Sequence, residues 1–135
     1  MSECIFCKII KKELPADFVY ENDKIVAFLD IMPVNAGHTL VVPKEHHVDV
    51  LETPDGVLAE MMMKTKKIAQ GIMKATKADG FNIGVNTKLA AGQAVFHTHF
   101  HIIPRFSADG LKHWPHKKIE KQEMQKVRDA IKLQL

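Results

Sequence analysis

Three alternate histidines, His97, His99 and His101, are the residues of this chain best suited to chemistry. Side chains alternate between the two faces of a β-strand, so a strand here would place all three imidazoles on one face, with neighbours roughly 7 Å apart. An exposed polar face has no need of three histidines, and burying imidazole costs free energy unless it is hydrogen-bonded. Imidazole titrates near neutrality, so the spacing predicts a site for proton transfer, nucleophilic attack, anion binding or metal binding.

Two cysteines, Cys4 and Cys7, form a CxxC pair near the start of the sequence. The spacing suits either a redox pair or half of a metal site. A thioredoxin-like pair normally follows a strand in a βαβ pattern, and no strand is predicted before Cys4. Two cysteines are also too few for a disulfide framework, so the metal reading is favoured.

Two other positions could meet a ligand. Gly92 precedes the histidines, and a glycine lets backbone N–H groups approach an anion closely. Asp30 ends a predicted strand, where its carboxylate could accept hydrogen bonds from sugar hydroxyls. An aspartate after a strand is also a common structural turn residue.

Length and composition point to one ordinary domain over residues 1–135. The net charge is only +3 and the lysines are spread along the chain, which does not favour nucleic-acid binding. No apolar run approaches the roughly 20 residues needed to span a bilayer, and Met1 is followed by Ser-Glu-Cys rather than by a signal-like segment. We therefore expect a cytoplasmic protein with no membrane partner.

Hydrophobic periodicity predicts an α+β fold, with strands joined by hairpins around one long helix. The histidines should lie on the sheet face opposite that helix. The helix should begin with Thr53 as N-cap and extend to residue 76, and its apolar stripe, which includes Met62, should be core. Further helices are expected at residues 2–12, with Ser2 as N-cap, and 119–135, and strands at residues 18–21, 24–30, 38–42, 81–86 and 95–104.

With these residues in hand, the chain resembles the histidine triad (HIT) family, and within it the small Hint-like nucleotide-binding branch. The resemblance covers most of the chain, and it rests on Cys4-Ile-Phe-Cys7-Lys-Ile-Ile10, Phe28-Leu-Asp-Ile31, Val41-Val-Pro-Lys-Glu-His46, Asn86, Gly92-Gln93, the triad and His113-Trp-Pro115. It implies a five-stranded antiparallel sheet with one long central helix and short terminal helices.

The resemblance also implies a nucleotidyl hydrolase or transferase acting on purine nucleoside phosphoramidates or related compounds. His99 would attack the α-phosphate to form a covalent nucleotidyl-histidine, and His101 would hold phosphate oxygens. Asp30 and Ile31 would contact the ribose. Other implied substrate-binding residues are Phe6, Ile9 and Phe28 around the base, and Asn86, Gly92, Gln93, Ala94 and Val95 near the phosphate. A homodimer with a continuous sheet is implied, with Trp114 near the partner's site.

Ala94 departs from the family pattern, because many relatives have serine there; the departure bears on rate and leaving-group preference. Two other functions stay open: a dinucleoside polyphosphate hydrolase, and a nucleotide-binding module with negligible turnover.

Family members that share Cys4, Cys7, His46 and His97 further imply a structural zinc at these positions, a Cys₂His₂ set suited to tetrahedral zinc. The alternative is two buried thiols beside a hydrogen-bonded histidine pair. In the zinc interpretation His97 is the triad member that holds metal. His38, His47, His113 and His116 are interpreted as ordinary polar positions.

Overall fold

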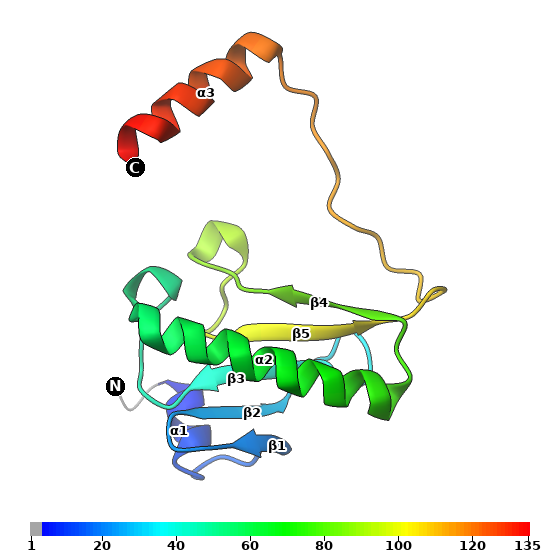
Figure 1. Ribbon diagram of the computed structural model, residues 1–135. Coiled ribbons are helices and arrows are strands. Elements are labelled where there is room, and N and C mark those ends of the chain that lie inside the picture. Colours follow the sequence, from blue (N-terminus) through cyan, green and yellow to red (C-terminus); the bar gives the residue numbers. More distant parts are fainter. Residues whose placement is uncertain (1–3) are drawn as a thin grey trace.

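The structure, a computed structural model, describes residues 4–135 and contains one five-stranded antiparallel sheet in the order β1-β2-β3-β5-β4 (Figure 1). Each strand is antiparallel to its neighbours, which confirms the α+β class. The first four strand predictions are correct to within two residues at either end. The strands are β1 (Phe18–Glu21), β2 (Ile25–Leu29), β3 (Thr39–Pro43), β4 (Gly80–Gly84) and β5 (Phe100–Arg105).

Two helices sandwich the sheet. Helix α2 (Asp55–Thr76) crosses one face, where its Met61 and Ala69 pack on Ile25, Val41 and Ile102. Helix α1 (Ile5–Ile10) lies against the other face, where a second cluster gathers around Phe6 and Phe28. Short 3₁₀ helices span Val50–Glu52 and Leu89–Ala91.

The histidines lie on the face that α1 covers. His101 pairs across the sheet with Leu40, which belongs to the cluster around Phe6, and residues opposite each other in neighbouring strands share a face. Their predicted place on the side opposite α2 is therefore confirmed.

The strand predicted over residues 95–104 begins only at Phe100. His97 and His99 lie in the segment just before it, so the expectation of three histidines on one regular strand is wrong. The N–H of Thr98 donates to the carbonyl of His47 over 2.8 Å, and the Thr98 hydroxyl bonds the Thr53 hydroxyl over 2.7 Å. At Thr98 this segment is therefore hydrogen-bonded to the loop that follows β3, and not to β3 itself.

Both predicted helix starts need correction. The described helix α1 begins at Ile5 with Cys4 as N-cap, whose sulfur accepts from the N–H of Cys7; the predicted cap Ser2 lies outside the described residues. Helix α2 has Pro54 as N-cap and no side-chain cap, because the Thr53 hydroxyl is turned inward to the carbonyl of Asp49. Met62 is 45% exposed and is not core.

Helix α3 (Lys121–Gln134) matches the predicted C-terminal helix but packs on nothing in the described chain, and Figure 1 shows it far from the sheet. Among the described residues, no helix combines the length and apolar character that a membrane crossing requires.

Candidate active site and candidate metal centre

The ring of His99 is held in one tautomer. Its Nδ1 lies 2.7 Å from the carbonyl oxygen of His97, and because a carbonyl only accepts, Nδ1 carries the proton and Nε2 keeps a lone pair. His99 is only 7% exposed, and its ring meets that of Phe6 in a T-shaped contact with the centroids 5.0 Å apart. Burial lowers the pKa of His99 below its usual value, so the ring is neutral at pH 7. A neutral, oriented imidazole with a free Nε2 is a competent nucleophile.

A chain of hydrogen bonds fixes His101 in the opposite tautomer. The N–H of Val34 donates to Nδ1 of His38 over 3.0 Å, so the proton of His38 must sit on Nε2. That Nε2 lies 2.9 Å from Nδ1 of His101, which must therefore accept. His101 is left with Nε2–H, a donor. Its ring lies against that of His99, with the centroids 5.0 Å apart.

His38 is a candidate site residue that the sequence interpretation missed, because that interpretation made it an ordinary polar position. The structure buries it to 3% exposure, against His101 and 3.5 Å from the carboxylate of Asp30. Strand periodicity could have found it, because His38 is two residues before Leu40 and so falls on the face that carries His101.

The third histidine, His97, turns to a cluster of sulfur and nitrogen atoms. Its Nε2 lies 2.8 Å from the carbonyl of Pro43, so Nε2 carries the proton and the lone pair of Nδ1 is directed at the cluster. That Nδ1 lies 3.4 Å from the sulfur of Cys4, 3.7 Å from the sulfur of Cys7 and 3.1 Å from Nδ1 of His46.

The cluster has close to the dimensions of a tetrahedral zinc site, although the 3.1 Å between the two Nδ1 atoms is slightly shorter than the spacing of zinc ligands. Zinc bonds to nitrogen and sulfur imply separations between ligand atoms of roughly 3.3–3.8 Å, and the sulfur of Cys7 also lies 3.4 Å from Nδ1 of His46. All four ligand atoms lie within 4.8 Å of one another. Burial and the neighbouring Cys4 raise the pKa of the Cys7 thiol. A divalent cation would favour the thiolate, so the donor set fits zinc.

Beside His99 and His101 lies an apolar cavity of about 530 Å³. Helix α1, the end of β2 and the segment before β5 line it. Among the predicted substrate-binding residues it brings together Phe6, Ile9, Phe28, Asp30, Ile31, Ala94 and Val95. Phe6 and Phe28 are buried core residues and also line the cavity.

The remaining predicted residues lie elsewhere. Asn86 and Trp114 border a second cavity, of about 540 Å³, which His38 and His101 also line. Gly92 has a positive φ of 92° and faces the amide of Asn86. The side chain of Gln93 is buried, where it donates to the carbonyls of Val48 and Val95 and accepts from the N–H of Lys88.

The HIT domain family model matches residues 11–108, and the chain belongs to the HIT (histidine triad) family. The named relatives include a protein from Arabidopsis thaliana called adenylylsulfatase HINT3, which is 42% identical over 98% of this chain. The chain spans 66% of that plant protein's length.

Solved structures agree. The chain matches SMU.412c from Streptococcus mutans at a TM-score of 0.92 and 39% identity, over 99% of this chain and 86% of that one. A zinc-bound histidine triad family protein from Mycobacterium smegmatis matches at a TM-score of 0.80 and 36% identity, over 98% of this chain and 95% of that one.

Proposed function

We propose that this protein is a nucleotidyl hydrolase in which His99 forms a covalent intermediate with the α-phosphate of a purine nucleotide. Membership of the HIT family and the name of the plant relative support the broader class, a hydrolase acting on nucleotides. The observation that carries the finer proposal is the opposed tautomers of the two adjacent rings. His99 offers a lone pair at Nε2 and His101 offers an N–H.

The reaction has two steps. Nε2 of His99 attacks the α-phosphorus, the bond from phosphorus to the leaving group breaks, and that group departs with a proton from water. Water then attacks the same phosphorus, the bond to Nε2 breaks, and a nucleoside monophosphate is released. Throughout, Nε2–H of His101 stabilises charge on the phosphate oxygens.

The apolar cavity supports a base site with the ribose at its rim. Aromatic and aliphatic side chains from α1 and β2 form its wall, with no dense polar cluster to read a base edge, so discrimination between adenine and guanine should be modest. One carboxylate oxygen of Asp30 accepts from the N–H of Met32. The other is directed toward His38 and can also accept from a ribose hydroxyl.

The phosphate contacts are assigned to backbone on the 92–95 segment. The side chain of Gln93 is occupied by its own loop, so its part is to hold that loop in place. Ala94 offers a backbone N–H but no hydroxyl. The second cavity, bordered by Asn86 and Trp114, is assigned to the leaving-group side.

We place this enzyme in the cytoplasm as a homodimer that pairs through β4, one of the two edge strands of the sheet, with Trp114 of each chain near the partner's site. Zinc would be held by Cys4, Cys7, His46 and His97 in a closed site, which makes its role structural. The zinc-bound mycobacterial structure supports this assignment.

Three substrates separate the candidate functions: an adenosine phosphoramidate, a diadenosine polyphosphate and adenylyl sulfate, the last suggested by the plant relative's name. Each is incubated with the protein and with a His99→Ala variant, and the products are resolved by chromatography. Release of AMP from the phosphoramidate at the highest kcat/KM supports the proposal. Preference for the dinucleotide would favour the polyphosphate hydrolase. AMP binding with no product from any substrate would indicate a binding module.

A further inference from the structure

The loop between β2 and β3, residues 31–37, supplies the contact that sets the tautomer of His38. The N–H of Val34 reaches Nδ1 of His38 over 3.0 Å. The loop itself buries little surface, because Ile31, Met32 and Val34 are 90%, 82% and 46% exposed. A segment with few buried contacts opens easily unless hydrogen bonds hold it. The position of the Val34 N–H therefore depends on an anchor elsewhere in the loop.

Asn35 is that anchor. It is half-buried, whereas residues 31–34 and 36 are exposed. Its Nδ2 donates to the carbonyl of Pro104 over 2.9 Å and to a carboxylate oxygen of Asp109 over 3.2 Å. Both of these oxygens only accept, so the amide is fixed with its donors facing them. The backbone carbonyl of Asn35 also accepts from the N–H of His38 over 3.0 Å. Asn35 thus ties the loop to β5 and to His38 at once.

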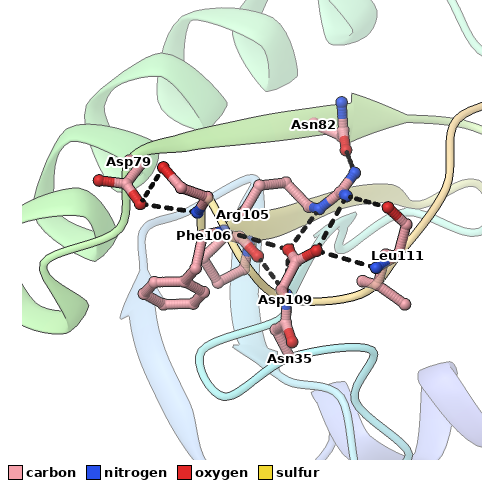
Figure 2. Close-up of polar contacts among 9 residues, drawn as sticks. Asn35, Asp79, Asn82, Arg105, Phe106, Asp109 and Leu111 are labelled. Carbon is pink, nitrogen blue, oxygen red and sulfur yellow. Dashed lines mark hydrogen bonds and ion pairs between the residues drawn. The ribbon is translucent and has the colours of Figure 1, made fainter.

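The anion that Asn35 contacts is itself held rigidly. Arg105 and Asp109 form a paired contact, with Nε and Nη2 of the guanidinium 2.8 Å and 3.2 Å from the two carboxylate oxygens, and Asn35 faces this pair (Figure 2). Asp109 also accepts from the N–H groups of Phe106 and Leu111. The Arg105 guanidinium, followed by these two N–H groups, holds the pKa of Asp109 far below its ordinary value. The amide of Asn35 therefore bonds a permanent charge, which strengthens the hydrogen bond.

The hydrogen bond from Val34 decides which nitrogen of His101 carries a proton. While Nδ1 of His38 accepts from a backbone N–H, the proton of His38 is confined to Nε2, which donates to Nδ1 of His101 over 2.9 Å. If Val34 moved away, Nδ1 of His38 could carry the proton instead, and Nε2 would then accept from His101. His101 would turn a lone pair, and not an N–H, toward the phosphate.

We propose that Asn35 is a positioning residue, whose amide holds the loop so that the Val34 N–H sets the tautomers of His38 and His101. The proposal rests on the proposed function, because it concerns the donor that His101 offers to the phosphate. Asn35 is not among the residues that line either cavity of the site, so it acts only through the loop.

The test uses two variants of Asn35 and one matched control. Asn35→Asp has the same shape but turns both donors into acceptors facing Asp109 and Pro104, and Asn35→Ala removes the anchor without adding charge. The control is Asp79→Ala, which removes the contacts of Asp79 with the N–H and hydroxyl of Ser107, over 2.8 Å and 3.1 Å, in the same turn after β5 (Figure 2). Circular dichroism checks that each variant is folded.

The first readout is the nitrogen NMR spectrum of protein labelled with ¹⁵N in its histidine rings, which distinguishes protonated from unprotonated ring nitrogens. In the wild type and in Asp79→Ala, His101 should carry its proton on Nε2. In both Asn35 variants a substantial fraction should carry it on Nδ1. The second readout is turnover of an adenosine phosphoramidate. The Asn35 variants should lose up to about tenfold in kcat, as expected for loss of one hydrogen bond, with KM within about twofold.

Each outcome decides the role of Asn35. A wild-type His101 protonated on Nδ1, or ring signals that are unchanged in both Asn35 variants, would overturn the proposal. So would a rise in KM with kcat unchanged, or an equal change in Asp79→Ala, which would reflect a general weakening of the turn. A wild-type protein that hydrolyses no nucleotide substrate would overturn the proposed function, while the ring signals would still show whether Asn35 sets the tautomers.

Discussion

The carbonyl oxygen of His97 accepts a hydrogen bond from Nδ1–H of His99 over 2.7 Å, while the ring of His97 is directed at Cys4 and Cys7. One residue therefore positions the proposed nucleophile with its backbone and a candidate metal centre with its side chain. The proposed active site and the candidate metal centre have different chemistry, but both depend on the position of His97.

Removing the nucleophile should abolish turnover and spare binding. In His99→Ala the Nε2 that forms the covalent bond is gone, and loss of a nucleophile costs several orders of magnitude in rate. Product release measures the rate, and AMP titration calorimetry checks that the site survives. His116→Ala, at an exposed position, is the control and should behave as wild type. A His99 variant that keeps more than about a tenth of the wild-type rate would disprove the assignment.

Replacing His38 should impair catalysis through His101. His38→Ala removes the donor that holds His101 as an Nε2–H tautomer, and loss of such an orienting partner typically costs about 10–100-fold. The loss should appear mainly in kcat, and the acid limb of the pH–rate profile should shift. His38→Gln, which keeps an amide donor, should recover part of the rate. A change in KM alone, with an unmoved pH profile, would mean that His38 only packs.

Asp30 should recognise the ribose. Asp30→Ala should weaken AMP binding by about tenfold, the loss expected for a hydrogen bond to a charged group, and should leave binding of the 2′,3′-dideoxy analogue nearly unchanged. Asp30→Asn keeps an oxygen for the N–H of Met32 and so controls for collapse of the turn. Equal effects of Asp30→Ala on both ligands, or no effect on either, would contradict the assignment.

Protein purified without chelators should contain one zinc per chain. Binding needs thiolates, so zinc should be released as the pH falls. Cys4→Ser should lower the melting temperature more than it lowers the rate of the folded fraction. The control is His47→Gln, next to a ligand in sequence but paired with Glu45, and it should keep its zinc. Substoichiometric zinc at neutral pH, or full retention after both cysteines are replaced, would show that the ligands are misassigned.

His101 should make the fold less stable in acid. Burial, followed by the neighbouring His99 and His38, lowers the pKa of His101 from 6.5 to about 4. Between these values the unfolded chain binds a proton that the folded chain excludes, so stability falls as the pH drops from about 6.5 toward 4. A full proton difference amounts to at most about 1.4 kcal/mol per pH unit.

Thermal melts of wild type and His101→Gln across this window provide the measurement. The zinc ligands contribute equally to both proteins, so the difference between the two slopes isolates His101. His116→Gln should keep the wild-type slope. Identical slopes for wild type and His101→Gln would show that the folded ring titrates normally.

The fold class, the central helix and the face that carries the histidines could be predicted because they follow from local periodicity. The tautomers of the triad histidines could not be predicted from the sequence. They depend on partners distant in sequence, such as the carbonyl of Pro43 for His97 and the N–H of Val34, through His38, for His101. The start of β5 was misplaced because Thr98 bonds a loop, and alternation alone cannot distinguish an extended segment from a hydrogen-bonded strand.

The candidate metal centre could likewise be predicted only in part. The spacing of Cys4 and Cys7 is a local signal, whereas His46 joins them only because β3 and the segment before β5 are brought together by the sheet. Only the structure gives the distances between the four candidate ligand atoms. Periodicity also predicted a helix over residues 119–135, which the structure has at Lys121–Gln134, but it could not indicate that this helix would pack on no surface of its own domain.

Helix α1 has a consequence beyond its packing. Cys4 caps it and Cys7 lies in its first turn, while Phe6 and Ile9, on the same six-residue helix, line the apolar cavity. With zinc and purine bound as proposed, each ligand would order the element that the other needs, so their binding free energies are coupled, and the coupling must be reciprocal. Bound nucleotide would then raise the affinity for zinc by the same factor by which zinc raises the affinity for nucleotide. Substrate would therefore slow the loss of the metal when zinc is scarce.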